Sequence, residues 1–296
     1  MAPTSANQKR LRVAVIDLYG GEPNQGMRCI RGLIEENSGR WDGVTLDYEI
    51  FETRSNRAVP GLDYDVFIST GGPGSPFDGV GKPWEENYFQ WLRALWRHNR
   101  ESGESPRHAF FICHSFQMMC RFFRLGEVVR RRSESFGIFP VHKAQAGAQD
   151  VLFAGLDDPF YAADFRNWQV VLPDRKALRA LNASILAIEK LRPHVELERA
   201  VMGIRLSREI VGVQFHPEAD AEGMLRHFSE ARRRAHIIAE HGEEKYGRII
   251  RRLEDPDYLD RTYRTVVPAF LKGAVEARVG RAGHTDVIPR VPRDLW

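Results

Sequence analysis

The sequence predicts an α/β fold: an open, largely parallel central sheet with helices on both faces (flavodoxin-like), plus a C-terminal helical extension. Short runs of β-branched and aromatic residues alternate with longer segments of helical periodicity along residues 11–123. Such alternation implies βαβ units, whose parallel strands are covered on both faces. After residue 221 the apolar residues keep a helical spacing only, which predicts the extension.

The elements follow in order along the chain. Strands are expected at 11–18, 44–51, 65–70 and 109–112, and helices at 25–36, 83–100 and 115–123. Shorter β-rich pieces are expected at 128–131, 138–142, 169–172, 184–189, 195–205 and 210–214. One apolar set at helical spacing runs from Met224 to Ile238, two more follow around a break at Asp255-Pro256, and 281–296 is expected to be irregular. We therefore expect a domain over 1–225 and a helical extension over 226–296 packed on it.

Composition narrows the function classes. The 296 residues are 43% hydrophobic and 28% charged, and a net charge of +3 implies no general attraction to nucleic acid. The runs Arg130–Arg132 and Arg232–Arg234 are expected to be solvated. Three cysteines without metal-ligand spacing suit a reducing compartment. With no apolar leader and no membrane-spanning stretch in this sequence, a cytoplasmic location is expected.

One cysteine stands where a nucleophile would. Cys113 ends an apolar run at a strand-to-helix turn, where a helix N-terminus favours a thiolate. About a hundred positions later, His216 precedes a proline and is therefore pushed toward an extended conformation. Residues two apart in an extended chain face the same side, so Glu218 can orient one ring nitrogen while the other faces a thiol. This is the nucleophile, base and orienter arrangement of acyl transfer. Cys29 and Cys120 are expected to be structural.

A glycine-rich run follows the strand expected at 65–70. Gly71-Gly72-Pro73-Gly74 would let backbone N–H groups approach a ligand closely, as a developing oxyanion requires. Both this run and Cys113 fall at the carboxyl ends of predicted parallel strands, where ligands bind in such sheets.

Three motifs together resemble the class I (triad-type) glutamine amidotransferases, most closely the glutaminase domain of GMP synthetase. They are GGPGSP at 71–76, Cys113-His114-Ser115-Phe116-Gln117, and GVQFHPE at 212–218, and the resemblance spans roughly 11–225. It implies hydrolysis of the glutamine side-chain amide to glutamate and ammonia through a cysteinyl thioester, with no metal or organic cofactor. Because this sequence carries no ATP-binding P-loop, the ammonia would pass to an unidentified acceptor on a possible separate synthetase subunit.

The resemblance also implies roles for individual residues. The catalytic triad would be Cys113, His216 and Glu218, and the backbone N–H groups of Gly72 and His114 would bind the oxyanion. The His114 side chain is given no catalytic role. The substrate would be bound by Gly71, Gly74, Gln117, Phe165 and Arg166, with Arg166 pairing to a substrate carboxylate.

The sequence departs from the family in three places. Phe111 and Ser115 occupy positions where the family has glycine, and the stretch 164–167 does not match the family's Ser-His-Gly-Asp-like segment. Two alternatives stay open: a γ-glutamyl peptide hydrolase, and a non-catalytic regulatory or interaction module in which the helical extension docks a partner.

Overall fold

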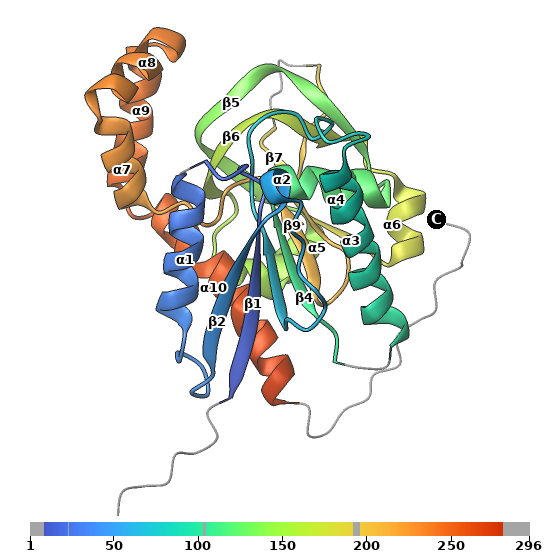
Figure 1. The fold of residues 1–296 in the computed structure, drawn as a ribbon. Helices are drawn as coiled ribbons and strands as arrows, with labels where there is room; N and C mark the ends of the chain where they lie inside the picture. The colour runs from blue at the N-terminus through green and yellow to red at the C-terminus, as the bar shows by residue number, and fades with distance from the viewer. Residues whose placement is uncertain (1–8, 23, 103–104, 192–195, 281–296) are drawn as a thin grey trace, which may run out of the picture.

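The computed structural model describes residues 9–22, 24–102, 105–191 and 196–280, so the segment 281–296, predicted to be irregular, lies outside the described residues. The described chain forms one nine-stranded sheet with helices on both faces (Figure 1). The strands are β1 (Arg10–Asp17), β2 (Thr45–Glu52), β3 (Val66–Ser69), β4 (His108–Ile112), β5 (Glu127–Lys143), β6 (Phe160–Val171), β7 (Ser184–Glu189), β8 (Val201–Arg205) and β9 (Ile210–Val213). The helices are α1 (Gln25–Asn37), α2 (Thr53–Asn56), α3 (Pro83–Glu101), α4 (His114–Phe123), α5 (Gln145–Gln149), α6 (Arg175–Leu181), α7 (Ala221–Ser229), α8 (Ala231–His241), α9 (Glu243–Glu254) and α10 (Leu259–Val279).

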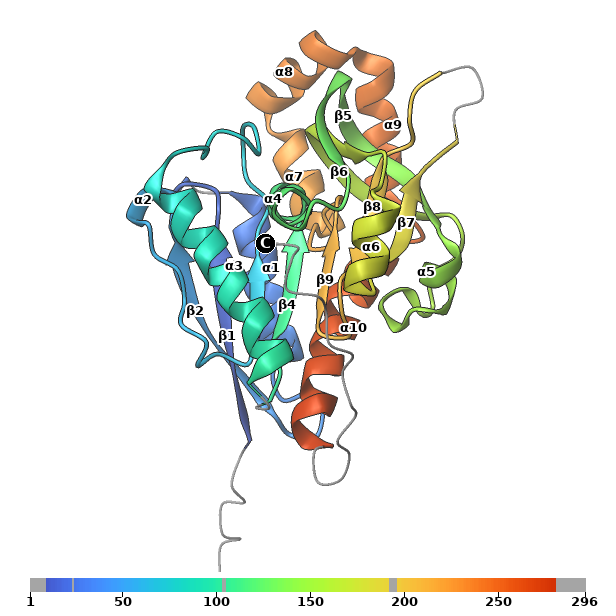
Figure 2. The same cartoon turned by 90° about the vertical axis from the view of Figure 1, so that its right-hand side faces the viewer.

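The sheet has a parallel half and an antiparallel half. Its order is β2-β1-β3-β4-β9-β8-β7-β5-β6, and the pairings from β2 to β9 are parallel. This half has the 2-1-3-4-5 strand order of flavodoxin-like folds, with β9 in the fifth place. From β9 to β6 the pairings are antiparallel, and these strands curl away from the parallel half (Figure 2). The predicted fold class is confirmed.

The antiparallel half differs in detail from the prediction. The pieces expected at 128–131 and 138–142 are one strand, β5, with a register shift between Arg130 and Ser135. The piece at 169–172 is the end of β6, which starts at Phe160. The sequence did not reveal residues 160–168 as a strand because buried charged residues interrupt its apolar pattern.

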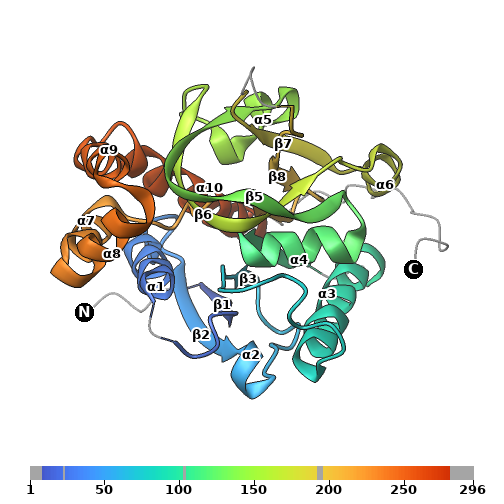
Figure 3. The same cartoon turned by 90° about the horizontal axis from the view of Figure 1, so that it is seen from above.

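Alternating residues of β1 serve two cores. Val13 and Val15 belong to a cluster that includes residues of α1 and α10, whereas Ala14 and Ile16 belong to a cluster with α3 and α4. Successive side chains of a strand point to opposite faces, so a central strand with two buried faces reads as continuously apolar. Figure 3 shows helices around both faces of the sheet.

The C-terminal region is helical, as predicted, and its helices pack in two places. The apolar set from Met224 to Ile238 is divided between α7 and α8 at Glu230. These two helices and α9 pack on β5 and β6 in a third apolar cluster. The last helix, α10, instead covers the central sheet beside α1, and its Phe270 ring lies 5.1 Å from the ring of Phe110 in β4. The division of the chain at residue 225 stays a prediction.

In the part of the chain that the structure describes, no helix is both long and apolar enough to cross a membrane.

We expect Leu271→Ala to lower the free energy of unfolding by about 2–5 kcal/mol, because it leaves a cavity beneath α10. Leu271 is fully buried in the cluster that α10 shares with the central sheet. Chemical denaturation measures the change, and the exposed neighbour Lys272→Ala is the matched control. A loss no larger than that of the control would contradict this packing.

Candidate active site

Cys113 occupies a strained turn between β4 and α4. Its backbone angles are φ 48° and ψ −97°, a conformation that costs a non-glycine residue about 1–3 kcal/mol unless its surroundings fix it. The surroundings do so through main-chain hydrogen bonds. The Cys113 N–H donates to the Val213 carbonyl at 2.8 Å, and the Cys113 carbonyl accepts from the Gln117 N–H at 3.0 Å. The residue is 5% exposed, so the thiol is almost completely shielded from solvent.

The two departures beside the cysteine are accommodated without filling the site. The Ser115 hydroxyl accepts the Ile112 N–H at 2.8 Å and donates to the Ser69 carbonyl at 2.7 Å, so it ties the turn to β3. Phe111 is fully buried among residues of α3 and α4, with its ring centre 6.2 Å from that of Trp91. Gly212 makes room for it, since a Cβ there would lie 3.1 Å from the Phe111 Cβ.

His216 and Glu218 form the expected pair. The Nδ1 atom of His216 lies 2.8 Å from Oε1 of Glu218, and the His216 N–H donates to the Ala163 carbonyl of β6 at 2.8 Å. Because Nδ1 faces the carboxylate, Nε2 is the ring nitrogen that can give or take a proton in a reaction. Cys113 lies close enough to the His216 ring to raise the pKa of the imidazole, so the structure places the three predicted triad residues in one region.

The electrostatics of this pair favour a protonated imidazole. Burial alone would lower the pKa of His216, but the Glu218 carboxylate and Cys113 outweigh burial and hold this pKa well above its ordinary value. Glu218 is 1% exposed and its second oxygen, Oε2, is buried without a hydrogen-bond partner in the described residues. A buried carboxylate needs a counter-charge, and the imidazolium supplies one. His216 can therefore hold a proton for a departing group at neutral pH.

The glycine loop lies directly beside these residues. It starts at the carboxyl end of β3, and a Cβ at Gly71 would lie 2.9 Å from Cε1 of His216. A Cβ at Gly72 would lie 2.5 Å from the Leu18 carbonyl oxygen, so only glycine allows this close approach to the end of β1. Gly74 has a positive φ of 82°. The roles of these glycines, and of the His114 N–H, stay predictions.

Gln117 is nearly buried one turn after the cysteine. Its Nε2 donates to the Trp168 carbonyl of β6 at 3.0 Å and to Oε1 of Gln214 at 3.1 Å. Gln214 in turn places its own amide nitrogen 3.7 Å from the Cys113 sulfur. Sequence reasoning assigned no role to Gln214, although it lies within the GVQFHPE motif.

Phe165 and Arg166 point to opposite sides of β6. The Phe165 ring is 6.1 Å from the His216 ring and is partly exposed, so it lines the site. The Arg166 side chain is only 1% exposed, and it pairs with Asp164 at 2.8 Å and with Glu189 at 3.5 Å. Asp164 and Glu189 thus engage Nε and Nη2 of Arg166, whereas its buried Nη1 has no hydrogen-bond partner among the described residues. These contacts favour a structural role, and a contact of Arg166 with a substrate carboxylate stays a prediction.

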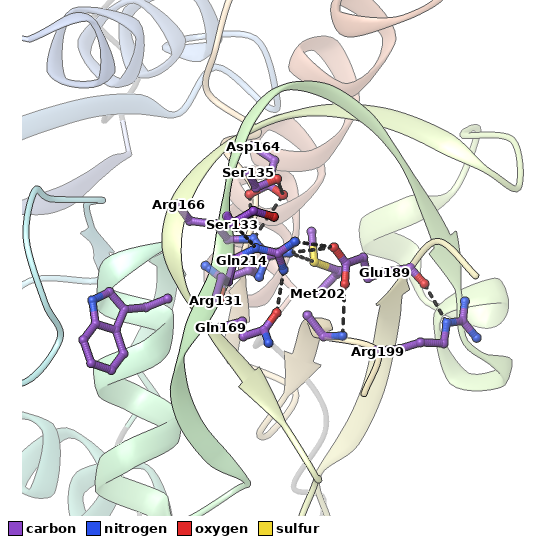
Figure 4. A network of polar contacts seen from close by, with 12 residues as sticks. Arg131, Ser133, Ser135, Asp164, Arg166, Gln169, Glu189, Arg199, Met202 and Gln214 are labelled. Atoms are coloured by element: carbon purple, nitrogen blue, oxygen red, sulfur yellow. Dashed lines mark hydrogen bonds and ion pairs between the residues drawn. The ribbon is translucent and has the colours of Figure 1, made fainter. Parts of the chain in front are cut away.

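Arg166 belongs to a buried polar network, shown in Figure 4. We define the network as Arg131, Ser135, Asp164, Arg166 and Glu189. The Arg131 side chain, expected to be solvated, is only 7% exposed and lies 3.1 Å from Glu189. Its neighbours Arg130 and Arg132 are exposed, as the alternation of a strand requires.

Tyr19 is a residue of the site that sequence reasoning missed. It follows β1, and a Cβ at Gly71 would lie 3.0 Å from its hydroxyl. Burial raises the pKa of the Tyr19 phenol well above its ordinary value, and Glu218 and Cys113 add to this rise. Its position after the first parallel strand was the available signal.

The described residues contain no group of three or more His, Cys, Asp or Glu side chains arranged to hold a metal ion.

Comparisons with known proteins bear on the fold. No family model matches the chain, and no curated protein does. Among solved structures, a glutamine amidotransferase from Thermotoga maritima has a TM-score of 0.64 at 18% identity, covering 90% of this chain and 98% of its own. The glutaminase domain of CTPS from Trypanosoma brucei, solved with bound acivicin, has a TM-score of 0.56 at 12% identity, covering 96% and 98%. A candidate GMP synthase subunit from Thermoplasma acidophilum has a TM-score of 0.53 at 16% identity, covering 92% and 98%.

These likenesses define the fold. The chain has the class I glutamine amidotransferase fold, as the three motifs predicted. At 12–18% identity, these structural similarities establish the fold alone. The activity therefore has to be argued from the residues of the site.

We expect Glu218→Gln to shift the alkaline limb of the kcat/KM profile for glutamine to lower pH. The Glu218 charge holds the pKa of His216 up, so its removal lets the imidazolium lose its proton at lower pH. The loss of kcat should be roughly 10- to 100-fold milder than in His216→Ala, because the base itself is retained. An unmoved alkaline limb, or a loss equal to that of His216→Ala, would contradict the assigned role.

We expect Arg166→Met to destabilise the fold by about 3–5 kcal/mol, because it leaves Asp164 buried without its cation. The KM for glutamine of the folded variant should stay unchanged. Denaturation and steady-state kinetics check both points, with the exposed Arg130→Met as control. A raised KM for glutamine with unchanged stability would instead indicate that Arg166 binds the substrate.

Proposed function

We propose that this protein is a class I glutamine amidotransferase that carries out the glutaminase half-reaction with Cys113, His216 and Glu218. The observation that carries the proposal is the strained Cys113 turn near a histidine that Glu218 orients and whose pKa Cys113 helps to raise. A merely structural cysteine in the core would need neither the strain nor the charged partner.

Acylation would begin with attack of the Cys113 thiolate on the side-chain carbonyl carbon of glutamine. The carbonyl oxygen becomes an oxyanion, which the N–H groups of Gly72 and His114 would stabilise. When this intermediate collapses, the carbon–nitrogen bond breaks and His216 gives its Nε2 proton to the departing nitrogen. Ammonia leaves, and a γ-glutamyl thioester remains on Cys113.

Deacylation would use the same groups in reverse. The now neutral His216 takes a proton from water, and the resulting hydroxide attacks the thioester carbonyl. The carbon–sulfur bond breaks, glutamate leaves, and the thiolate–imidazolium pair is restored. Glu218 keeps Nδ1 of His216 protonated throughout, so that Nε2 alone exchanges protons.

Substrate binding would use the groups around Cys113 and His216. Gln117 has its amide nitrogen engaged by Trp168 and Gln214, which leaves its carbonyl oxygen for the substrate's amino group. Phe165 would form a wall beside His216, and Gly71 and Gly74 would border the reacting amide. The ammonia acceptor would be bound by a separate synthetase subunit.

We expect Cys113→Ala to lower glutaminase activity by roughly 10³-fold or more, since no positioning effect replaces the thiolate. Ammonia release from glutamine measures the change. Cys120→Ala is the matched control, because Cys120 is fully buried in the core that α3 and α4 form and should tolerate the loss of its sulfur. Near-normal turnover by Cys113→Ala would refute the proposal.

The same assay with γ-glutamyl dipeptides separates the two hydrolytic functions. Glutamine should be turned over with the higher kcat/KM. Faster cleavage of the dipeptides would instead identify a γ-glutamyl peptide hydrolase.

A further inference from the structure

Arg54 joins two segments that meet at the active site. It lies in the short helix α2, and its Nη1 donates to the Pro73 carbonyl at 2.8 Å. Its Nη2 lies 2.5 Å from Nε2 of His114, and its guanidinium centre is 5.3 Å from the Trp84 ring. One planar group thus holds the glycine loop and the first residue of α4 at the same time.

One contact is with a residue that carries a proposed oxyanion N–H, and the other is with the neighbour of such a residue. Pro73 follows Gly72, whose N–H is proposed to bind the oxyanion, and His114 carries the other proposed N–H itself. The distance between these two amides depends on how the loop lies against the start of α4. The Arg54 guanidinium hydrogen-bonds both segments and therefore fixes that distance.

The His114 ring is suited to accept from Arg54. His114 is 2% exposed, and burial lowers its pKa well below the ordinary value, as do the charges of Arg54 and Arg121. A neutral ring that accepts at Nε2 carries its proton on Nδ1, so the contact is a directed hydrogen bond.

Arg54 has no carboxylate partner, unlike the second arginine at this loop. Arg121 hydrogen-bonds the Pro76 carbonyl and pairs with Glu85 at 2.9 Å. Among the described residues no carboxylate lies within ion-pair distance of Arg54, although Asp78 and Asp17 act on it from further away. A structural ion pair therefore does not explain Arg54, whereas two acceptors next to the oxyanion site do.

We propose that Arg54 is a positioning residue that sets the geometry of the oxyanion hole by locking residues 71–76 to the start of α4. The inference rests on the proposed function for its kinetic consequence, while its structural part stands on the contacts of Arg54 alone. Because the oxyanion is absent from bound glutamine and develops only on the way to the tetrahedral intermediate, loss of this lock lowers kcat and leaves KM nearly unchanged.

The test compares Arg54→Gln and Arg54→Lys with the wild type in two measurements. We expect Arg54→Gln to lower kcat for glutamine about 10- to 100-fold, less than the loss of an oxyanion donor itself, with KM within about 3-fold of wild type. The kcat of Arg54→Lys should lie between those of the wild type and Arg54→Gln, because an ammonium group keeps the charge but cannot form both hydrogen bonds of the planar guanidinium. Hydrogen–deuterium exchange of residues 71–76 should be faster in both variants. Arg97→Gln, an exposed arginine on α3, should change neither measurement.

Each outcome decides the inference. Wild-type kcat in Arg54→Gln overturns it, as does a raised KM with unchanged kcat, which would make Arg54 a ground-state substrate ligand. If Arg54→Gln unfolds, Arg54→Lys carries the comparison, and a wild-type kcat with unchanged exchange in that variant overturns the inference. If the wild type releases no ammonia from glutamine, the proposed function fails. The exchange data then decide separately whether Arg54 holds the loop.

Discussion

The parallel pairing of β4 with β9 is the constraint on which the site depends. Ile112 is paired with Val213, and the hydrogen bond from the Cys113 N–H to the Val213 carbonyl continues this ladder one residue further. The chain therefore leaves β4 at Cys113 beside the segment that leads to His216. A one-residue slip would turn every side chain of β4 to the opposite face and separate the two groups.

The strand β6 links the antiparallel half of the sheet to this pairing. Its Ala163 carbonyl holds the backbone of His216, its Phe165 faces the His216 ring, and its Trp168 carbonyl holds Gln117. On its other face, Asp164 and Arg166 belong to the buried polar network. That network is costly to desolvate and specifies one arrangement of β5, β6 and β7, because each of its charges needs the others. The site thus has rigid support on the side where the parallel sheet ends.

The sequence predicted the parts of the structure that follow from local pattern. The strands ending near Thr70 and Ile112 were expected within one or two residues, because short apolar runs bounded by polar residues or glycine leave few alternatives. The catalytic motifs were readable because their chemistry needs fixed residue types at fixed spacing. The rest depended on tertiary contacts. Arg166 looked like a free cation until its carboxylate partners were known, and Arg54 lies about sixty residues from the histidine that it contacts.

The measurement that tests the central claim most directly is mass spectrometry of the protein, acid-quenched during turnover of glutamine. We expect a γ-glutamyl adduct that peptide fragmentation assigns to Cys113, and no adduct on Cys29 or Cys120. Turnover without an adduct on Cys113, or with an adduct on one of the other two cysteines, would contradict the account.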